Sequence, residues 1–320
     1  MLKIHSKPNA ASCRVVLALF LLAFTFDTSG ARADERGKSV TLAAVGDVLF
    51  ARGVGKKIDA YGPDYPFELV SDVLNSYDLA FCNLECVLSD RGTPRIKRFL
   101  FRADPDRAQI LSSAGFDIVS LANNHTLDFG PDALQDTIDG IQNSGMTQVG
   151  TMLKGSDDAG VKYIEKNGLK IGFLAISEFE NFYDETPDGL PFVMRINEDT
   201  LPRQVSDARA NCDVLIVSIH WGVDNIPFWT DRQQMIGKMC IDNGADLVLG
   251  HHPHVLQKIE NYKGNPIVYS MGSFLWDYPM HEADKTAIFV FELSPGSAIL
   301  TETIPAEIEE CRPVLERDSG

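Results

Sequence analysis

Most of the residues that could do chemistry stand at five places in the sequence, each directly after a short apolar run. Seven histidines occur in the chain, and His125, His220, His252 and His254 are at such places. Imidazole nitrogens together with carboxylate and amide oxygens suit borderline divalent metals such as zinc, manganese or iron. One group alone is a weak signal, because a lone Asp after a strand more often caps a helix. All five together indicate a metal site. They carry Asp47, Asn83 with Glu85, Asn123 with Asn124 and His125, His220, and His252 with His254.

Residues 116–130 illustrate how the fold would position such groups. Residues 116–121 form an apolar run with β-branched members, which predicts a buried strand. Asn123, Asn124 and His125 follow the run, and Asp128 lies just beyond. In open α/β sheets, ligands bind outside the carboxyl ends of the strands. The plain alternative is an Asn-rich turn that caps a helix beginning near Pro131. Four other strand ends of the same kind favour a functional site.

The order of the predicted elements indicates an α/β fold. Strands at residues 40–45, 79–82 and 116–121 alternate with helices at residues 69–74, 105–114 and 131–144. This alternation is typical of parallel strands with crossover helices. Asn167-Gly168 between two apolar runs predicts a β-hairpin on a type I′ turn. Residues 178–197 have no period and are expected to form a loop. Further strands are predicted at residues 214–219, 247–249, 267–269, 288–291 and 298–303, and further helices at residues 199–209 and 231–243.

The N-terminus has the three parts of a signal peptide. Lys3, Lys7 and Arg14 are basic, residues 15–26 are mostly apolar, and residues 31–33 read Ala-Arg-Ala, a cleavage site. The apolar run is shorter than the roughly 20 residues of a permanent membrane helix. An uncleaved anchor is the alternative. We expect residues 1–33 to be removed and residues 34–320 to form a single domain that is periplasmic or secreted.

The charge balance limits the classes of partner. The chain has 29 Lys and Arg against 45 Asp and Glu, a formal net charge of −16. Its field would therefore repel nucleic acid. An anionic substrate needs a metal or a local basic patch to receive it. Residues 91–107 hold such a patch, for which a solvated loop and helix start is the alternative explanation. Its basic members are Arg91, Arg95, Lys97, Arg98, Arg102 and Arg107.

Six motifs resemble those of the CapA family, the capsule or poly-γ-glutamate biosynthesis branch of the calcineurin-like metallophosphoesterases. They are GDVLFAR (46–52), NLE (83–85), ANNHTLDFG (122–130), HWG (220–222), GHHPHVLQ (250–257) and YSMGSF (269–274). The resemblance spans residues 40–293, nearly all of the chain after the predicted signal peptide. It implies a four-layer α/β/β/α sandwich of two mixed sheets, metallophosphoesterase-like, with a metal site at one sheet edge.

The resemblance also implies roles for individual residues. One or two divalent ions (Mn, Zn, Fe or Ca) would be bound, with Asn83 as an alternative ligand to Glu85. His125 would be the general acid or phosphate-facing imidazole, oriented by Asp128. The implied metal ligands are Asp47, Glu85, Asn124, His220, His252 and His254. The expected substrate contacts are Asn83, Asn123, Arg52, Trp221 and Ser273, where Trp221 could equally pack its loop.

The first motif departs from those of related phosphoesterases. Their first strand ends in Asp-x-His, whereas Asp47 is followed by Val48 and Leu49. One imidazole ligand is therefore missing, and the site would hold one metal, bind it weakly, or prefer a harder ion. Ser273 stands where the family often has Asn, and Asp224 where Glu is expected after HWG.

Two functions are compatible with these residues. The first is a metal-dependent hydrolase acting on a phosphoester or on the γ-linked amide of an anionic polymer. The second is a non-catalytic accessory protein that binds such a polymer during its synthesis or export. Proton abstraction next to a metal-activated carbonyl is a third chemistry, which nothing in the sequence singles out. The expected partners are the anionic polymer or phosphoester and a membrane-bound polymer synthase, and not nucleic acid.

Overall fold

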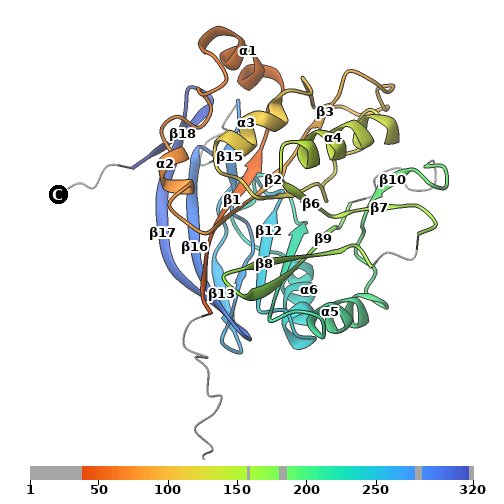
Figure 1. Cartoon of the computed structure of the whole chain (residues 1–320), viewed down its shortest axis with the longest axis vertical. Helices are drawn as coiled ribbons and strands as arrows, with labels where there is room; N and C mark the ends of the chain where they lie inside the picture. Colours follow the sequence, from red (N-terminus) through yellow and green to blue (C-terminus); the bar gives the residue numbers. More distant parts are fainter. Residues whose placement is uncertain (1–37, 157–158, 180–185, 278–282, 317–320) are drawn as a thin grey trace, which may run out of the picture. The chain divides into compact units, whose positions relative to one another are not determined.

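Two mixed β-sheets face each other, and helices cover their outer faces (Figure 1). This computed structural model describes residues 38–156, 159–179, 186–277 and 283–316, so the predicted signal peptide lies outside the described residues. The layers are those of the expected four-layer α/β/β/α sandwich, and the predicted fold class is confirmed. None of the described helices is long and apolar enough to cross a membrane.

The first sheet has eight strands and contains the predicted parallel strands. β1 (Val40–Val48) is parallel to β2 (Leu79–Leu84) and antiparallel to β16 (Lys285–Ser294). β2 is in turn parallel to β5 (Ile118–Ser120), as the alternation of strands and helices predicted. The other members are β6 (Thr147–Val149), β15 (Ser273–Leu275), β17 (Ser297–Glu309) and β18 (Arg312–Leu315). The order is β18-β17-β16-β1-β2-β5-β6, with β15 paired to β1.

The second sheet has six strands and includes the predicted hairpin. β8 (Val161–Lys166) and β9 (Leu169–Ser177) are joined by Asn167 and Gly168, whose φ angles of 51° and 74° are both positive, as a type I′ turn requires. The next strands along the sheet are β11 (Val214–His220), β12 (Leu247–His251), β14 (Asn265–Val268) and β13 (Ile259–Tyr262). β9, β11, β12 and β14 run parallel, and β11 is buried along its whole length.

Two short ribbons lie beside the sheets. One pairs β3 (Val87–Leu88) with β4 (Arg102–Ala103), and the other pairs β7 (Thr151–Leu153) with β10 (Pro191–Val193). β10 falls within residues 178–197, where we predicted a loop, so that prediction was wrong at this point. Local periodicity did not reveal β10, because its conformation depends on pairing with a strand far away in the sequence.

Helices on the two outer faces complete the layers. α3 (Arg107–Ser113) and α4 (Pro131–Asn143) pack on the first sheet, whereas α5 (Leu201–Arg209) and α6 (Asp231–Asp242) pack on the second. α4 has Pro at its first position, and α6 begins with a capping box in which Thr230 and Gln233 satisfy each other's backbone N–H groups. The short helices α1 (Arg52–Tyr61) and α2 (Ser71–Leu74) follow β1.

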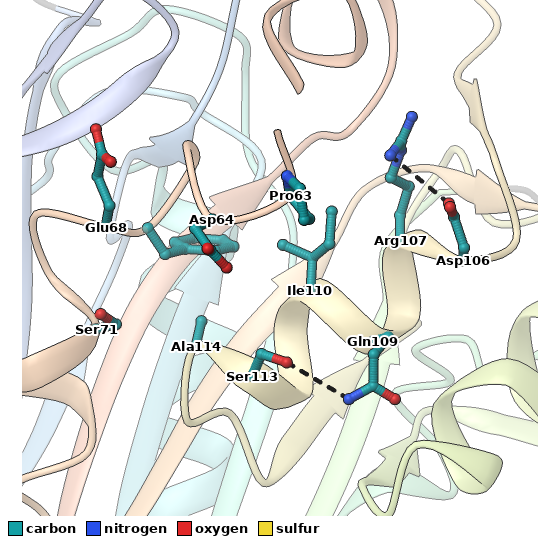
Figure 2. A pocket seen from close by; sticks show the side chains of 11 residues that line it. Pro63, Asp64, Glu68, Ser71, Asp106, Arg107, Gln109, Ile110, Ser113 and Ala114 are labelled. Atoms are coloured by element: carbon teal, nitrogen blue, oxygen red, sulfur yellow. Dashed lines mark hydrogen bonds and ion pairs between the residues drawn. The ribbon is translucent and has the colours of Figure 1, made fainter. Parts of the chain in front are cut away.

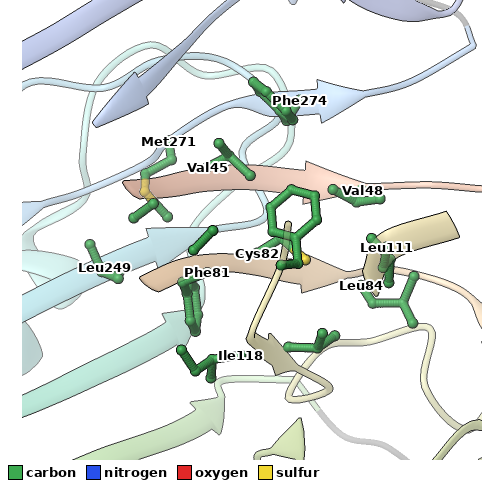
Figure 3. Close-up of a cluster of buried hydrophobic side chains, with 14 of the residues drawn as sticks. Val45, Val48, Phe81, Cys82, Leu84, Leu111, Ile118, Leu249, Met271 and Phe274 are labelled. Carbon is green, nitrogen blue, oxygen red and sulfur yellow. The ribbon is translucent and has the colours of Figure 1, made fainter. Parts of the chain in front are cut away.

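Apolar side chains from both sheets fill the space between them (Figure 3). Phe81 of β2 stacks on Phe173 of β9, with ring centroids 6.1 Å apart. Val45, Ile118 and Leu249 are fully buried in the same cluster. Because this core holds the sheets face to face, the carboxyl ends of β1, β2 and β5 stay next to those of β11 and β12.

Gly46 allows the backbone of Met271 and Gly272 to approach β1 closely, just before Asp47. A Cβ atom at Gly46 would lie 1.9 Å from the carbonyl oxygen of Gly272, which is far inside van der Waals contact. That carbonyl accepts a hydrogen bond of 2.9 Å from the backbone N–H of Asp47. The absence of a side chain at Gly46 therefore fixes the position of Asp47 relative to residues 271–273.

We predict that Gly46→Ala lowers the free energy of unfolding by about 2 kcal/mol or more, because the methyl group must push two backbone segments apart. Gly140→Ala is the matched control: its Cβ would lie 3.5 Å from the Cβ of Ala108, an ordinary contact, and α4 would gain helix propensity. Urea denaturation of both variants measures the difference. Equal stability of Gly46→Ala and wild type would contradict the packing argument.

Candidate metal centre

The ends of five strands bring the predicted ligands together at one edge of the two sheets. Asp47 is on β1, Glu85 follows β2, and His220 ends β11. Ligand atoms of Asp47, Glu85 and His220 all lie within 4.8 Å of one another, and so do those of Glu85, His252 and His254. Glu85 belongs to both groups, so it could bridge two ions. The sequence predicted this convergence from the shared direction of the strands.

Glu85 is the acid that both groups of candidate ligands share. It is 0% exposed, and neither carboxylate oxygen has a hydrogen-bond partner among the described residues. Its Oε1 lies 3.8 Å from the Nε2 atoms of His220 and His254 and 3.9 Å from the Nε2 of His125. Burial raises the pKa of the Glu85 carboxyl well above its usual range, and the charge of Asp47 adds to this. Buried carboxylates are normally paired or coordinate a metal, so the orphaned oxygens fit a divalent cation.

Both carboxylate oxygens of Asp47 have polar partners. Oδ1 accepts a hydrogen bond of 2.8 Å from Asn83, and Oδ2 accepts one of 3.1 Å from the backbone N–H of His252. The Nδ1 atoms of His251 and His254 each lie 3.3 Å from a carboxylate oxygen. Burial alone would raise the pKa of Asp47, but His251 and His254 hold it well below its usual range. Asp47 is therefore an ionised carboxylate in a fixed orientation.

Burial keeps two of the candidate histidine ligands neutral. It lowers the pKa of His220 well below its usual range and that of His252 to about 4. A neutral imidazole retains the lone pair that a metal requires. The Nε2 of His220 is 3.0 Å from Oδ1 of Asn124, so the predicted amide ligand also lies in the centre.

His125 and Asp128 form the predicted pair. The Nδ1 of His125 is 2.7 Å from Oδ2 of Asp128, which also accepts a hydrogen bond of 2.8 Å from the backbone N–H of Phe101. Lys97 donates hydrogen bonds of 2.7 Å both to Oδ1 of Asp128 and to the carbonyl oxygen of Asn124. We had grouped Lys97 with the basic patch, but it belongs to the site. No sequence pattern signals this contact, because Lys97 comes from an aperiodic loop.

The turn after β12 holds its histidines in a strained conformation. His252 and His254 have φ angles of 95° and 59°, in the left-handed region that residues with a side chain rarely adopt. Such strain concentrates at functional sites, where the surrounding structure maintains it. The bond from the His252 N–H to Asp47 is one contact that does so.

A cavity of about 280 Å³ adjoins the centre. Its lining includes Asn124, His125 and His254 together with Arg52, Arg98 and Asp224. The His125 ring stacks on Phe101 at 3.9 Å and the His254 ring packs against Trp276 at 4.4 Å between centroids.

A larger cavity, of about 470 Å³, lies beside α3 and holds none of the candidate ligands (Figure 2). Arg107 at its edge forms ion pairs with Asp59 and Asp104, at 2.8 Å each, and with Asp106 at 3.7 Å. Its size alone does not mark it as the site of chemistry.

The expected substrate contacts separate into one cavity residue and four buried ones. Arg52 lines the cavity and forms an ion pair with Asp277. Asn83, Asn123, Ser273 and Trp221 are at most 1% exposed. Asn123 bonds the Asn83 side chain and the Leu84 carbonyl oxygen, and Ser273 lies 3.2 Å from His254. Asn83, Asn123 and Ser273 therefore brace the ligands instead of facing the cavity.

Trp221 packs in the outer core of the second sheet. Its indole N–H donates a hydrogen bond of 2.9 Å to the carbonyl oxygen of Tyr269. This placement corresponds to the loop-packing alternative, and we withdraw Trp221 as a substrate contact. The predicted basic patch is likewise mostly engaged internally, since Arg91 pairs with Asp136, and Arg107 and Lys97 have the partners given above. Arg98 is exposed and lines the cavity.

Comparisons with known proteins agree with the motifs. A family model described as "Bacterial capsule synthesis protein PGA_cap" matches residues 41–278. The capsule biosynthesis protein CapA of Bacillus anthracis is 30% identical over 289 residues, covering 87% of this chain and 70% of that protein. The PGA biosynthesis protein CapA of Bacillus subtilis (strain 168) is 27% identical over 312 residues, covering 94% and 82%.

A solved structure supports the fold alone. The crystal structure of a hypothetical protein from Thermus thermophilus aligns with a TM-score of 0.53 at 17% identity, covering 83% of this chain and 99% of that chain. The family model spans most of the sequence and includes all six candidate ligands. The chain therefore belongs to the family of bacterial capsule synthesis proteins described as PGA_cap.

Proposed function

We propose that the protein is an exported, metal-dependent hydrolase that takes part in the synthesis or processing of a capsule or poly-γ-glutamate polymer. The observation that carries the proposal is Glu85, a fully buried carboxylate close to three imidazoles, whose two oxygens have no hydrogen-bond partner among the described residues. Its surroundings provide the mixture of nitrogen and oxygen ligands that borderline divalent metals bind. The family membership supports the link to the polymer.

Two sets of residues would hold the metal. Glu85, His252 and His254 form one set, and Asp47, Glu85 and His220 form the other, with Asn124 beside His220. A bound divalent ion supplies Lewis-acid activation of water and of the scissile bond. Asp47, Glu85, His220 and His252 are buried, whereas Asn124 and His254 line the cavity and would be its contact with the metal.

His125 is suited to deliver a proton to the leaving group. Asp128 accepts from Nδ1–H, and Nε2 is directed toward Glu85. The ring would deliver the proton from Nε2 in its doubly protonated form and keep the proton on Nδ1. Lys97 and the backbone N–H of Phe101 keep Asp128 in place and balance its buried charge. A positioned imidazole of this kind contributes general acid catalysis.

The cavity favours an anionic substrate. Arg52 and Arg98 line it, and the overall negative charge of the chain makes local cations necessary for such a ligand. A phosphoester and the γ-linked amide of polyglutamate both satisfy this requirement.

We also propose that residues 1–33 act as a signal peptide, so that residues 34–320 work as one domain in the periplasm or outside the cell. There, a membrane-bound polymer synthase would be the partner that supplies the anionic chain. N-terminal sequencing of protein recovered from the exported fraction would test this, and an intact N-terminus in the cytoplasm would refute it.

A second candidate function is a non-catalytic accessory protein that binds the polymer. The motivating observation is β1, which offers Asp47 as a ligand but then buries the apolar side chains of Val48 and Leu49. A relative from Mycobacterium tuberculosis (strain ATCC 25618 / H37Rv), 27% identical over 76% of this chain and 68% of its own length, is named a probable polyglutamine synthesis accessory protein.

Glu85→Gln tests whether the buried carboxylate serves a metal. Gln is close in size to Glu and stays neutral, and burial already favours the neutral form of Glu85 in the metal-free protein, so the free energy of unfolding in EDTA should be unchanged or higher by about 1 kcal/mol. With Zn²⁺ at about a hundred times its dissociation constant, wild type should gain about 2.7 kcal/mol, and the variant almost none. Urea denaturation with and without Zn²⁺ measures both. Glu165→Gln, at an exposed position of β8, should gain as much as wild type; an equal gain for Glu85→Gln would refute the metal role.

His252→Ala and His254→Ala should each reduce hydrolysis by a factor of about 100 or more, because each removes a candidate ligand. The mature protein is assayed with Mn²⁺ or Zn²⁺ on a generic phosphodiester and on poly-γ-glutamate, and its metal content is measured in parallel. Variants that retain both metal and wild-type activity would refute the ligand roles of His252 and His254, and a wild type that hydrolyses neither substrate with either metal would refute the hydrolase.

The accessory function makes a different prediction. His125→Ala should then bind poly-γ-glutamate like wild type, while Arg98→Glu should weaken binding about tenfold by reversing a charge at the cavity. Arg203→Glu on α5, whose side chain is 87% exposed, is the control and should bind like wild type. Isothermal titration calorimetry measures the affinities, and equal affinity of Arg98→Glu and wild type would count against polymer binding at this cavity.

A further inference from the structure

We propose that Asp224 is a positioning residue of the metal centre, which holds His252 in the tautomer that presents Nδ1 to the metal. The inference rests on the proposed metal-dependent function and adds a residue outside the set of predicted ligands. Oδ1 of Asp224 lies 3.2 Å from Nε2 of His252, within hydrogen-bond distance.

The two nitrogens of the His252 ring have contrasting environments. Nε2 faces the Asp224 carboxylate, whereas Nδ1 is buried and has no hydrogen-bond partner among the described residues. A carboxylate can only accept, so it selects the tautomer with the proton on Nε2. The lone pair is then on the buried Nδ1, and His252 belongs to the group of candidate ligands with Glu85 and His254. Metal-binding histidines commonly donate their other N–H to a carboxylate in this way, and the contact fixes the ring and raises its basicity.

Neighbouring rings hold the imidazole of His252 from its other sides. The centroid of Phe179 is 4.2 Å from that of His252, and the centroid of His220 is 4.9 Å away. His254 is the other imidazole near Asp224, with its Nε2 3.9 Å from Oδ1. Asp224 is thus the only carboxylate recorded in contact with Nε2 of His252 among the described residues.

The backbone ties the loop that carries Asp224 to the histidine turn. Asp224 lies in the loop after β11, and the N–H of the next residue, Asn225, donates a hydrogen bond of 2.8 Å to the carbonyl oxygen of Pro253. Asn225 itself has a φ of 60°. The loop after β11 is therefore attached to the turn that carries His252 and His254. The Asp224 side chain is 62% exposed, but this backbone hydrogen bond holds its loop in place next to His252.

Asp224→Ala should weaken Zn²⁺ binding by about tenfold or more, the range for loss of a residue that orients a metal ligand. Asp224→Asn should lose less, because its amide oxygen still accepts a hydrogen bond. The melting temperature of the metal-free protein should not change, since the side chain is mostly exposed. The full mature chain is titrated with Zn²⁺ and with Mn²⁺ by calorimetry. Asp139→Ala, at an exposed position of α4, is the matched control and should bind both ions like wild type.

The ¹⁵N spectrum of the metal-free protein provides a readout that a purely structural role would leave unaltered. Wild type should show the His252 proton on Nε2, and Asp224→Ala should lose this preference. Wild-type Zn²⁺ affinity in Asp224→Ala, or an unchanged tautomer, would overturn the proposal whether or not the protein is a hydrolase. If wild type binds Zn²⁺ but hydrolyses nothing, and Asp224→Ala binds it more weakly, the hydrolase falls and the role of Asp224 stands.

Discussion

The site depends on one constraint, a carboxylate that is fully buried and has no hydrogen-bond partner in the part of the chain that the structure describes. Glu85 lies between the imidazoles of His125, His220 and His254, all beyond hydrogen-bond distance. An uncompensated buried charge is costly, by several kcal/mol, and the remedies of a folded protein are pairing, protonation or a cation. Burial already drives the group toward protonation by raising its pKa. A divalent ion would favour the ionised form instead. The same burial that destabilises the unpaired carboxylate would therefore strengthen its attraction to a metal.

Polar contacts connect the two sheets at this edge, in addition to their shared apolar core. Asp47 of β1 accepts from the backbone N–H of His252, next to the end of β12, and it contacts the rings of His251 and His254. One carboxylate thereby supports a strained turn that belongs to the opposite sheet. Gly46 makes this possible because a side chain there would collide with Gly272. A substitution that changes the packing around Gly46 would therefore also move Asp47 and the histidines that it contacts.

The sequence predicted which candidate ligands converge better than it predicted the residues around them. Parallel strands deliver their carboxyl ends to one edge, so Asp47, Glu85 and His220 could be placed together from the pattern alone. Whether a polar residue faces the cavity or the interior depends on tertiary packing, which is why the expected substrate contacts Asn83 and Asn123 proved to be internal braces. Lys97 could not be foreseen, because its role arises from a loop that folds back on Asp128. α1 was also missed, since Gly53 and Gly55 in its first turns are unfavourable for a helix.

The two groups of ligands differ in chemistry, and this bears on the mechanism. One group has two imidazoles and a carboxylate, whereas the other has one imidazole and two carboxylates, because β1 continues into the apolar core after Asp47. Nitrogen-rich sites suit zinc and oxygen-rich sites suit harder ions such as manganese or calcium. Both groups of candidate ligands include Glu85, so a first ion would neutralise the Glu85 charge that would otherwise attract a second ion. Two ions can clamp both the attacking and the leaving oxygen, whereas one ion cannot do both at once. In the proposed hydrolase, a single bound ion would leave protonation of the leaving group to His125. The contacts of Asp128 and Lys97 with that ring would then matter more than the second set of candidate ligands.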